Sequence, residues 1–245
     1  MASYRGRGTH GQTVEVLGAR IVAGRIPEGG TLDIGGLGAE LDISLTALRE
    51  ALKVLAGKGL VDARQRRGTF VRERAAWNLL DSDVIRWQSE AGGDAAFVRD
   101  LTEMRAVVEP AAARYAALRR TAADLTALEA ALAAMAADGE DAAAAATADV
   151  AFHRALLAAS GNALLMRLDM FLEPGLFLRD LLVHRAGSAD DPVPGHADLV
   201  AAVRAGDPDT AETLMRGLLE KAAADVRRLQ GPSVAGPDGA GSREV

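Results

Sequence analysis

The sequence predicts a mainly α-helical protein in two parts, a smaller N-terminal unit and a larger helical bundle. Hydrophobic residues make up 49% of the 245 residues but aromatic residues only 4%, and alanine runs are frequent. This composition favours closely packed helices over a β-sandwich or barrel. Apolar residues recur at helical spacing along most of the chain, whereas residues 61–71 have the pattern of a short β-hairpin. The chain contains no cysteine, which excludes disulfides and thiolate metal sites.

The charge distribution separates the same two parts. Residues 1–75 hold 12 Lys/Arg against 8 Asp/Glu, a net charge of +4, and the remainder hold 16 against 26, a net charge of −10. A basic first third on an acidic whole is typical of a DNA-binding unit attached to a body that does not bind DNA. No signal peptide is visible, and no apolar run approaches the roughly 18 residues of a membrane span. We therefore expect a cytoplasmic protein with no membrane partner.

The N-terminal part begins with an arm and three helices. Residues 1–12 show no periodicity and are expected to form a flexible arm. Apolar residues predict a first helix over 13–24. A weaker second helix is expected over 34–41, because its three glycines each cost about 1 kcal/mol relative to alanine. The third helix, over 44–55, buries a leucine stripe, and the hydroxyl of Ser44 stands where an N-cap accepts from the first turn.

The front of the third helix points to DNA. Arg49 and Lys53 lie four residues apart on the side away from the leucine stripe, and Thr46 is one turn earlier. Such a cationic, hydroxyl-bearing front suits a DNA groove. The hairpin that follows carries its own polar tip, formed by Arg66, Arg67 and Gly68. Three helices followed by a two-stranded ribbon with a cationic tip predict a winged helix-turn-helix.

Short motifs occur along this unit in a characteristic order. They are P-x-G-G-x-L at 27–32, S-x-T-x-x-R-E-A-L-x-x-L at 44–55, G-L-V at 59–61 and R-G-T-F-V at 67–71. In this order they resemble the GntR family of bacterial transcription regulators. The segment WNLLDSDVIRW at 77–87 is similar to the linker of the FadR-like branch of that family. Within the branch, the chain is most similar to repressors of galactonate and related sugar-acid operons.

The resemblance implies a domain plan and a set of DNA contacts. The plan is a flexible arm at 1–12, a DNA-binding winged helix-turn-helix at 13–75, a linker at 76–94, an effector-binding and dimerisation domain at 95–230, and a disordered tail at 231–245. Two positions depart from the family, because Leu45 and Gly36 stand where relatives carry basic residues, which should lower affinity or alter sequence preference. The expected DNA-binding residues are Ser44, Thr46, Arg49, Arg66, Arg67 and Gly68.

The body is predicted to contain helices throughout, with no alternating strand pattern. Pro110 falls within the first of them and predicts a kink or a break at Glu109. The spacing and the resemblance together predict an all-α antiparallel helical bundle of the FCD type. The expected helices cover 97–118, 122–137, 141–159, 163–183, 196–205 and 208–229.

Asp149 and His153 are the body's clearest chemical signal. They lie four residues apart, so a carboxylate and an imidazole share one helix face and can hold one cation. The resemblance implies a third metal ligand at His196 and a fourth at a position that is Leu218 here. The expected site therefore has at most three of four protein ligands, for which zinc, nickel or manganese are conceivable. The alternative is an ordinary polar cluster with His153 hydrogen-bonded to a neighbour.

Two arginines are candidates for binding an effector carboxylate together with the metal ligands. Arg105 matches a cavity-facing arginine of the branch, and a guanidinium can clamp a carboxylate through two hydrogen bonds. The alternative for Arg105 is an ion pair with Glu109, four residues on. Arg228 is a further candidate, because its helical angle places it near the cavity-facing side.

The combined expectation is a homodimeric repressor that binds operator DNA and is released by a small carboxylate effector, such as a galactonate-like sugar acid. One alternative is a regulator that responds to acyl-CoA or another carboxylate. A second is a metal-dependent enzyme in the bundle, and a third is a module whose basic unit contacts a protein. No convincing catalytic set accompanies the Asp149–His153 pair, so we expect no enzyme.

Overall fold

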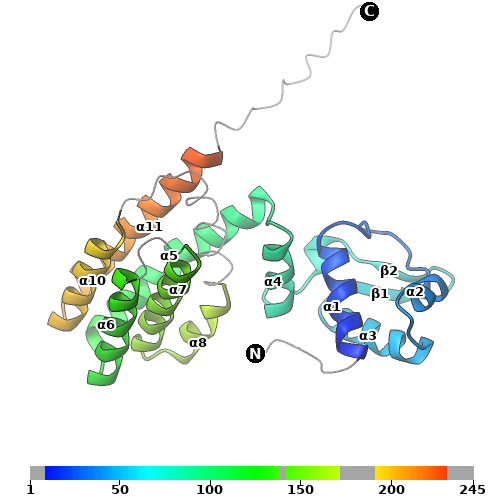
Figure 1. The fold of residues 1–245 in the computed structure, drawn as a ribbon, viewed down its shortest axis with the longest axis horizontal. Helices are drawn as coiled ribbons and strands as arrows, with labels where there is room; N and C mark the ends of the chain where they lie inside the picture. Colours follow the sequence, from blue (N-terminus) through cyan, green and yellow to red (C-terminus); the bar gives the residue numbers. More distant parts are fainter. Residues whose placement is uncertain (1–8, 138–141, 172–190, 231–245) are drawn as a thin grey trace, which may run out of the picture. The chain divides into compact units, whose positions relative to one another are not determined.

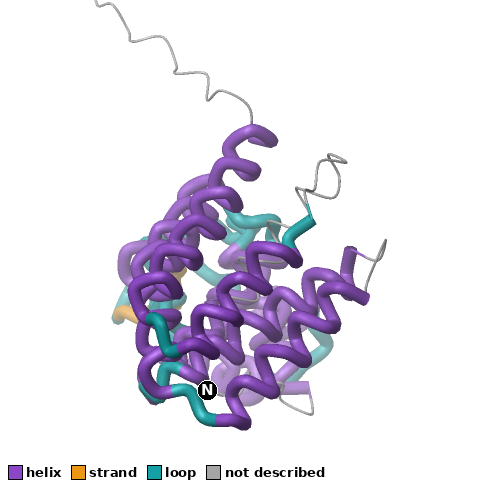
Figure 2. Tube along the Cα trace, turned by 90° about the vertical axis from the view of Figure 1, so that its left-hand side faces the viewer, coloured by secondary structure: helices purple, strands orange, loops and turns teal. Residues whose placement is uncertain are grey.

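The computed structural model describes residues 9–137, 142–171 and 191–230 (Figure 1). These residues form two compact units. The first comprises 9–104 with 167–171, and the second comprises 105–137, 142–166 and 191–230. Helices make up most of the described chain, joined by loops, and its strands form one small hairpin (Figure 2). Among these helices, none is long and apolar enough to cross a membrane.

The first unit packs three helices, a hairpin and a fourth helix around one core. Leu17, Leu48, Leu55 and Trp87 are almost completely buried there and belong to one apolar cluster. Its elements are α1 (Thr9–Val22), α2 (Ile34–Glu40), α3 (Leu45–Gly57), β1 (Val61–Arg64), β2 (Gly68–Val71), the 3₁₀ turn η1 (Arg74–Ala76) and α4 (Ser82–Glu90).

Local side-chain chemistry sets the limits of α2 and α3. The Asp33 carboxylate accepts from the backbone N–H of Gly36 at 3.0 Å, and the Ser44 hydroxyl accepts from that of Ala47 at 3.2 Å. Each of these bonds satisfies a donor that a helix N-terminus would otherwise leave free. The expected Ser44 cap is thereby confirmed.

The hairpin has the predicted position and a tight turn. Its register pairs Val61 with Val71 and Arg64 with Gly68, so residues 65–67 form the turn. Arg66 and Gly68 both have positive φ, +69° and +79°. Gly68 adopts this conformation without steric cost, whereas Arg66 carries a side chain there. The sharp reversal places the arginine-rich tip at the end of the ribbon.

The second unit is a helical bundle, which confirms the predicted mainly α fold. Within it α6 packs against α7 and α10, and α10 packs against α11. Its central apolar cluster includes Phe152, Leu156, Leu199 and Met215. Its helices are α5 (Ala95–Arg119, whose first part lies in the first unit), α6 (Ala122–Ala137), α7 (Ala142–Ala159), α8 (Ala163–Met166), α10 (Val193–Ala205) and α11 (Pro208–Gln230).

Two features of the first unit differ from the sequence expectation. Helix α1 begins at Thr9, so the expected arm is helical from there, and the burial of Gly11 and Thr13 explains why this polar turn is ordered. The segment expected as a linker contains the packed helix α4, in which Trp87 is 1% exposed. Trp87 lies so close to Gly18 that a Cβ there would be 2.3 Å from its ring.

Two predictions for the body need correction. Helix α5 continues through Pro110, so a break at Glu109 is absent. Proline deprives only the Ala106 carbonyl of its helical donor, and Ala106 is exposed, so water can replace that bond. The helix expected over 163–183 ends at Met166 and gives way to the 3₁₀ segment η2 (Arg167–Phe171). Phe171 is buried against other apolar residues of the first unit, and this packing overrides the helical spacing.

Several remaining expectations concern residues 1–8, 172–183 and 231–245, which lie outside the described residues. The two compact units divide inside α5, between Met104 and Arg105. The predicted domain limits at 75 and 94 stay predictions.

Candidate functional site

The outer face of α3 presents the polar residues that the sequence singled out. Ser44, Thr46 and Arg49 are exposed, because the leucine stripe on the opposite side is buried in the core. Lys53 forms an ion pair with Glu50 at 2.7 Å. No such pair involves Arg49 within the described part of the chain. Arg49 is therefore the α3 cation whose charge is left for an anionic partner.

The wing tip is cationic and partly fixed. The Arg67 guanidinium lies 3.7 Å from the centre of the Phe70 ring and donates to the Gly29 carbonyl at 3.1 Å. The Arg64 guanidinium lies over the same ring at 5.3 Å. A guanidinium over an aromatic face is attracted by the ring quadrupole, so Arg67 is held against the ribbon while remaining exposed. Arg66 projects from the turn itself.

The two departures from the family pattern are both exposed. Leu45 is the first residue of α3 and is 50% exposed. Gly36, in α2, is also exposed. Leu45 thus presents an apolar side chain at the exposed start of α3, where a cation would attract phosphate.

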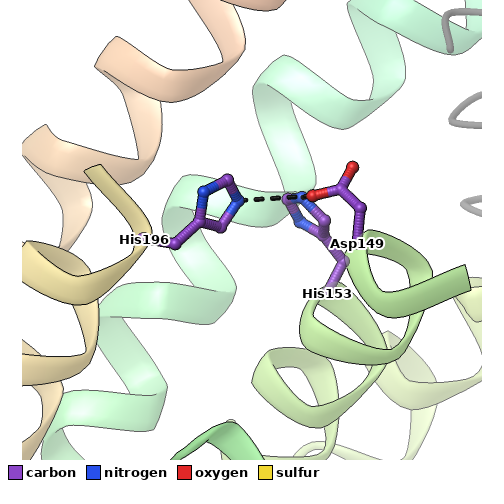
Figure 3. A group of neighbouring side chains, drawn as sticks. All are labelled: Asp149, His153 and His196. Carbon is purple, nitrogen blue, oxygen red and sulfur yellow. Dashed lines mark ion pairs between the residues drawn. The ribbon is translucent and has the colours of Figure 1, made fainter. Parts of the chain in front are cut away.

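In the second unit, Asp149 and His153 of α7 meet His196 of α10 (Figure 3). All three side chains are buried, and one ligand atom from each lies within 4.8 Å of the others. Asp149 Oδ1 is 3.5 Å from His153 Nε2 and 3.4 Å from His196 Nε2. The helix spacing predicted the first pair, and the packing of α10 brings in the third residue.

His196 is oriented by its own helix. Its Nδ1 donates to the Pro192 carbonyl at 2.8 Å, in the first turn of α10. The other nitrogen, Nε2, faces Asp149 Oδ1 at 3.4 Å. The Phe152 ring stands edge-on to the imidazole, with ring centres 4.7 Å apart, and limits its rotation. His196 thus presents a ligand atom to the point that Asp149 and His153 also face.

Glu109 of α5 completes the cluster, and the sequence analysis missed it as a site residue. Its Oε2 lies 2.6 Å from His153 Nδ1, as an ion pair rather than a linear hydrogen bond. Its Oε1 lies 2.5 Å from Arg105 Nε. The Glu109 side chain is only 1% exposed. The available signal was its spacing from Arg105, which indicated the ion pair but not the histidine.

The charges in the cluster shift one another's protonation strongly. Burial alone would raise the pKa of Glu109, but Arg105 and His153 outweigh it and lower that pKa to about 2. Burial likewise opposes charge on His153, yet Glu109 and Asp149 raise its pKa to about 9. The pKa of Asp149 is held well below its usual range, because both imidazoles outweigh the effect of burial. The cluster therefore favours a positive charge between its carboxylates.

These residues fit a divalent metal ion. One carboxylate oxygen and two imidazole nitrogens form a donor set common to zinc, nickel and manganese sites. The His196 Nε2 atom is buried and makes no hydrogen bond within the described residues, as a metal ligand requires. Leu218 lies against Gly195, the residue before His196, since a Cβ on Gly195 would be 2.8 Å from its Cδ2. The described chain therefore offers three ligands, with an apolar side chain nearby.

The structure separates the two candidate effector arginines. Arg105 is 6% exposed and pairs with Glu109, which is the alternative that the sequence analysis left open. Through Glu109 it is linked to the metal cluster. The Arg228 side chain is 65% exposed and pairs with Asp225 on the same helix. Arg228 is therefore not part of the buried cluster.

Family comparisons match both parts of the chain. A model described as "Bacterial regulatory proteins, gntR family" matches residues 9–71, and one described as "FCD domain" matches residues 100–221. The chain is 34% identical over 221 residues to the galactonate operon transcriptional repressor of Escherichia coli, covering 89% of this chain and 95% of that protein. It is 32% identical to the HTH-type transcriptional regulator LutR of Bacillus subtilis, covering 78% and 89%.

A third relative is the probable D-xylose utilization operon transcriptional repressor of Paenarthrobacter nicotinovorans, 31% identical over 78% of this chain and 77% of the relative. Among solved structures, Escherichia coli McbR/YncC matches with a TM-score of 0.52 and 16% identity, covering 92% of this chain and all of that one. The Listeria monocytogenes protein Lar matches with a TM-score of 0.61 and 16% identity, over 91% and 98%. At this identity the structural matches support the fold alone.

Proposed function

We infer the function from one premise, that this chain belongs to the GntR family of bacterial regulatory proteins and carries an FCD domain. The chain is accordingly a transcriptional repressor and not an enzyme. We propose that its first unit binds operator DNA and that its second unit binds a small acid whose presence releases the DNA. The exposed front of α3, with Arg49 left for an anionic partner, is the observation that carries the DNA-binding role.

Operator binding is tested most directly at Arg49. DNA upstream of the gene for this protein serves as the probe in a gel-shift titration. Arg49→Ala should abolish specific binding, because it removes the outward cation at the position from which recognition helices contact bases and phosphates. Lys53→Ala is the matched control, since Lys53 is an exposed cation of the same helix that already pairs with Glu50. Intact operator affinity in Arg49→Ala would refute this assignment of α3.

Leu45 offers the opposite test. Leu45→Arg restores a cation at the exposed start of α3 and should tighten operator binding. The logarithm of the binding constant falls linearly with the logarithm of the salt concentration. The slope of that line should steepen by about one unit for one added phosphate contact. An unchanged slope would place residue 45 away from the phosphate backbone.

The proposed assembly is a homodimer in which each first unit reads one half of a near-palindromic operator. A twofold protein imposes twofold symmetry on its site. Light scattering on the free protein should give twice the mass of one chain. Deleting one half of the operator should then weaken binding strongly, whereas a monomer would bind one half as well as the whole.

For the effector site, we propose that Asp149, His153 and His196 hold zinc, nickel or manganese. When bound, such an ion supplies a Lewis-acidic anchor for the carboxylate and hydroxyl oxygens of a sugar acid. Arg105 and Arg228 are retained as candidate contacts for the effector carboxylate. The likeness to the galactonate operon repressor favours a galactonate-like acid. A complete release would need about 5.5 kcal/mol of differential affinity between the DNA-bound and released states.

A release screen separates the candidate effectors. Galactonate, other hexonates, lactate, xylose and a long-chain acyl-CoA are each added to the preformed protein–DNA complex. Release by galactonate or a related hexonate supports the proposal. Release by acyl-CoA alone would favour the alternative of a lipid-responsive regulator. Release by a hexonate that disappears after chelation would additionally place the metal in the effector site.

A further inference from the structure

His153 and His196 are oriented in parallel ways, by different acceptors. Each imidazole faces Asp149 Oδ1 through Nε2, at 3.5 and 3.4 Å. Each places Nδ1 beside an oxygen: His196 Nδ1 donates to the Pro192 carbonyl, and His153 Nδ1 lies 2.6 Å from Glu109 Oε2 as an ion pair. An acceptor at Nδ1 selects the tautomer that leaves Nε2 free to bind a metal. The two rings therefore converge on one point from two helices.

The Glu109 carboxylate differs from the Pro192 carbonyl in being charged and buried. A buried carboxylate is tolerated only when it is compensated. Arg105 provides that compensation through Nε at 2.5 Å and through Nη2 at 3.4 Å. Arg105 and Glu109 lie four residues apart on α5, so one helix face delivers both groups. The chain Arg105–Glu109–His153 thus runs from a permanent cation to a candidate metal ligand.

We propose that Glu109, held by Arg105, is a positioning residue that fixes the orientation of His153 as a metal ligand. The proposal rests on the metal site of the proposed function. It gives Arg105 a role inside the protein, beside its role as a candidate effector contact. A carboxylate behind a metal-bound imidazole raises the basicity of the ligand and holds the ring in place, and its loss costs ten- to hundredfold in metal affinity.

The test measures zinc affinity in the full-length protein, by competition with a chromophoric chelator. Glu109→Met removes the acceptor at similar side-chain length and should weaken zinc binding about ten- to hundredfold. Glu109→Gln keeps a neutral acceptor oxygen and should lose less, about two- to tenfold. Ser160→Ala is the matched control, because it removes a buried hydrogen bond, from Ser160 Oγ to the Leu157 carbonyl at 2.6 Å, without touching the cluster. Its zinc affinity should equal that of the wild type.

A second readout is specific to positioning. The chain has only four histidines, so nitrogen NMR of the zinc-loaded protein can follow the His153 ring. The wild type and Glu109→Gln should show His153 protonated at Nδ1 and bound through Nε2. Glu109→Met should show exchange broadening or binding through the other nitrogen. A variant that was merely destabilised would keep the wild-type ring state while its melting temperature fell.

Three results would overturn the proposal. The first is a folded Glu109→Met variant with wild-type zinc affinity. If that variant does not fold, wild-type zinc affinity in Glu109→Gln has the same meaning. The third is the absence of zinc, nickel and manganese binding by the wild type, which would also remove the metal from the proposed function. Operator binding is measured on the same preparation, and its outcome tests the DNA-binding proposal independently of the metal.

Discussion

Each compact unit buries a cluster of charged side chains, and the two clusters differ in how their charges are matched. In the first unit, Lys58 donates to Asp81 at 2.8 Å and to Asp83 at 2.7 Å. Arg86 pairs with Glu15 at 2.7 Å and with Asp83 at 3.3 Å. The cations here are a lysine and an arginine, which remain charged at any physiological pH. Burial alone would lower the pKa of Lys58, yet the two aspartates raise it.

In the second unit the permanent cation, Arg105, is placed against Glu109. Asp149 instead faces two imidazoles, at 3.4 and 3.5 Å, whose charge depends on protonation. A buried carboxylate paired with lysine or arginine therefore holds elements of the fold together. A buried carboxylate that faces two imidazole nitrogens can instead accept an external cation.

The largest effect on the free energy of unfolding is expected from Lys58→Met. The substitution leaves Asp83, whose side chain is 2% exposed, without the cation that compensates its charge. Removing one partner of a buried pair costs about 3 to 5 kcal/mol. Urea denaturation followed by tryptophan fluorescence should show this loss, while zinc affinity stays at the wild-type value. A loss below about 1 kcal/mol would mean that the ion pairs of Lys58 do not stabilise the first unit.

Asp149→Asn should have the opposite effect: zinc affinity should fall, while the stability of the first unit stays unchanged. The amide is a poorer metal ligand than the carboxylate, and zinc affinity should fall about hundredfold, or about 2.7 kcal/mol. The rise in melting temperature on adding zinc should disappear, because the rise depends on the ratio of metal concentration to dissociation constant. The unfolding transition of the first unit should not move. Retained zinc-dependent stabilisation would show that the metal binds elsewhere.

Leu218→His tests the metal site by adding a possible fourth ligand. Leu218 lies against Gly195, the residue before the third ligand, and the family resemblance implies a fourth ligand at this position. A fourth protein ligand should raise zinc affinity about tenfold, or about 1.4 kcal/mol. Chelator competition against the wild type measures the gain. Leu218→Asn controls for the added polarity and should give none.

Arg228→Ala is expected to have the smallest effect. The Arg228 side chain is 65% exposed, and exposed ion pairs contribute about 0 to 1 kcal/mol. Stability and zinc affinity should remain close to those of the wild type. Effector release of DNA tests Arg228 as a candidate contact, and the exposure of its side chain predicts little change. A clear loss of effector response would return Arg228 to the effector site.

Local pattern was sufficient to predict most of the first unit and two of the three candidate metal ligands. The α3 stripe, the Ser44 cap and the Asp149–His153 pair all depend on residues within one turn or two of each other. His196 was assigned by resemblance, because its partners lie more than forty residues away. Glu109 could not be assigned to His153 from the sequence, since their approach is decided by how α5 and α7 pack.

Tertiary packing also explains the other misses. The start of α1 and the packing of α4 depend on burial that no local pattern displays. Gly18 illustrates the point, because its lack of a side chain is what admits the Trp87 ring. Pro110 and Phe171 likewise follow the surrounding structure more than their own propensities.

The placement of tryptophan gives this protein a built-in optical reporter. The chain has two tryptophans, Trp77 and Trp87, and both lie in the core of the first unit, 9% and 1% exposed. The metal cluster and the candidate effector contacts lie in the second unit. Tryptophan fluorescence, excited selectively over Tyr115 of the second unit, therefore observes the first unit alone. A change in emission when a metal or an acid is added would be a direct signal that events in the body reach the unit that holds DNA.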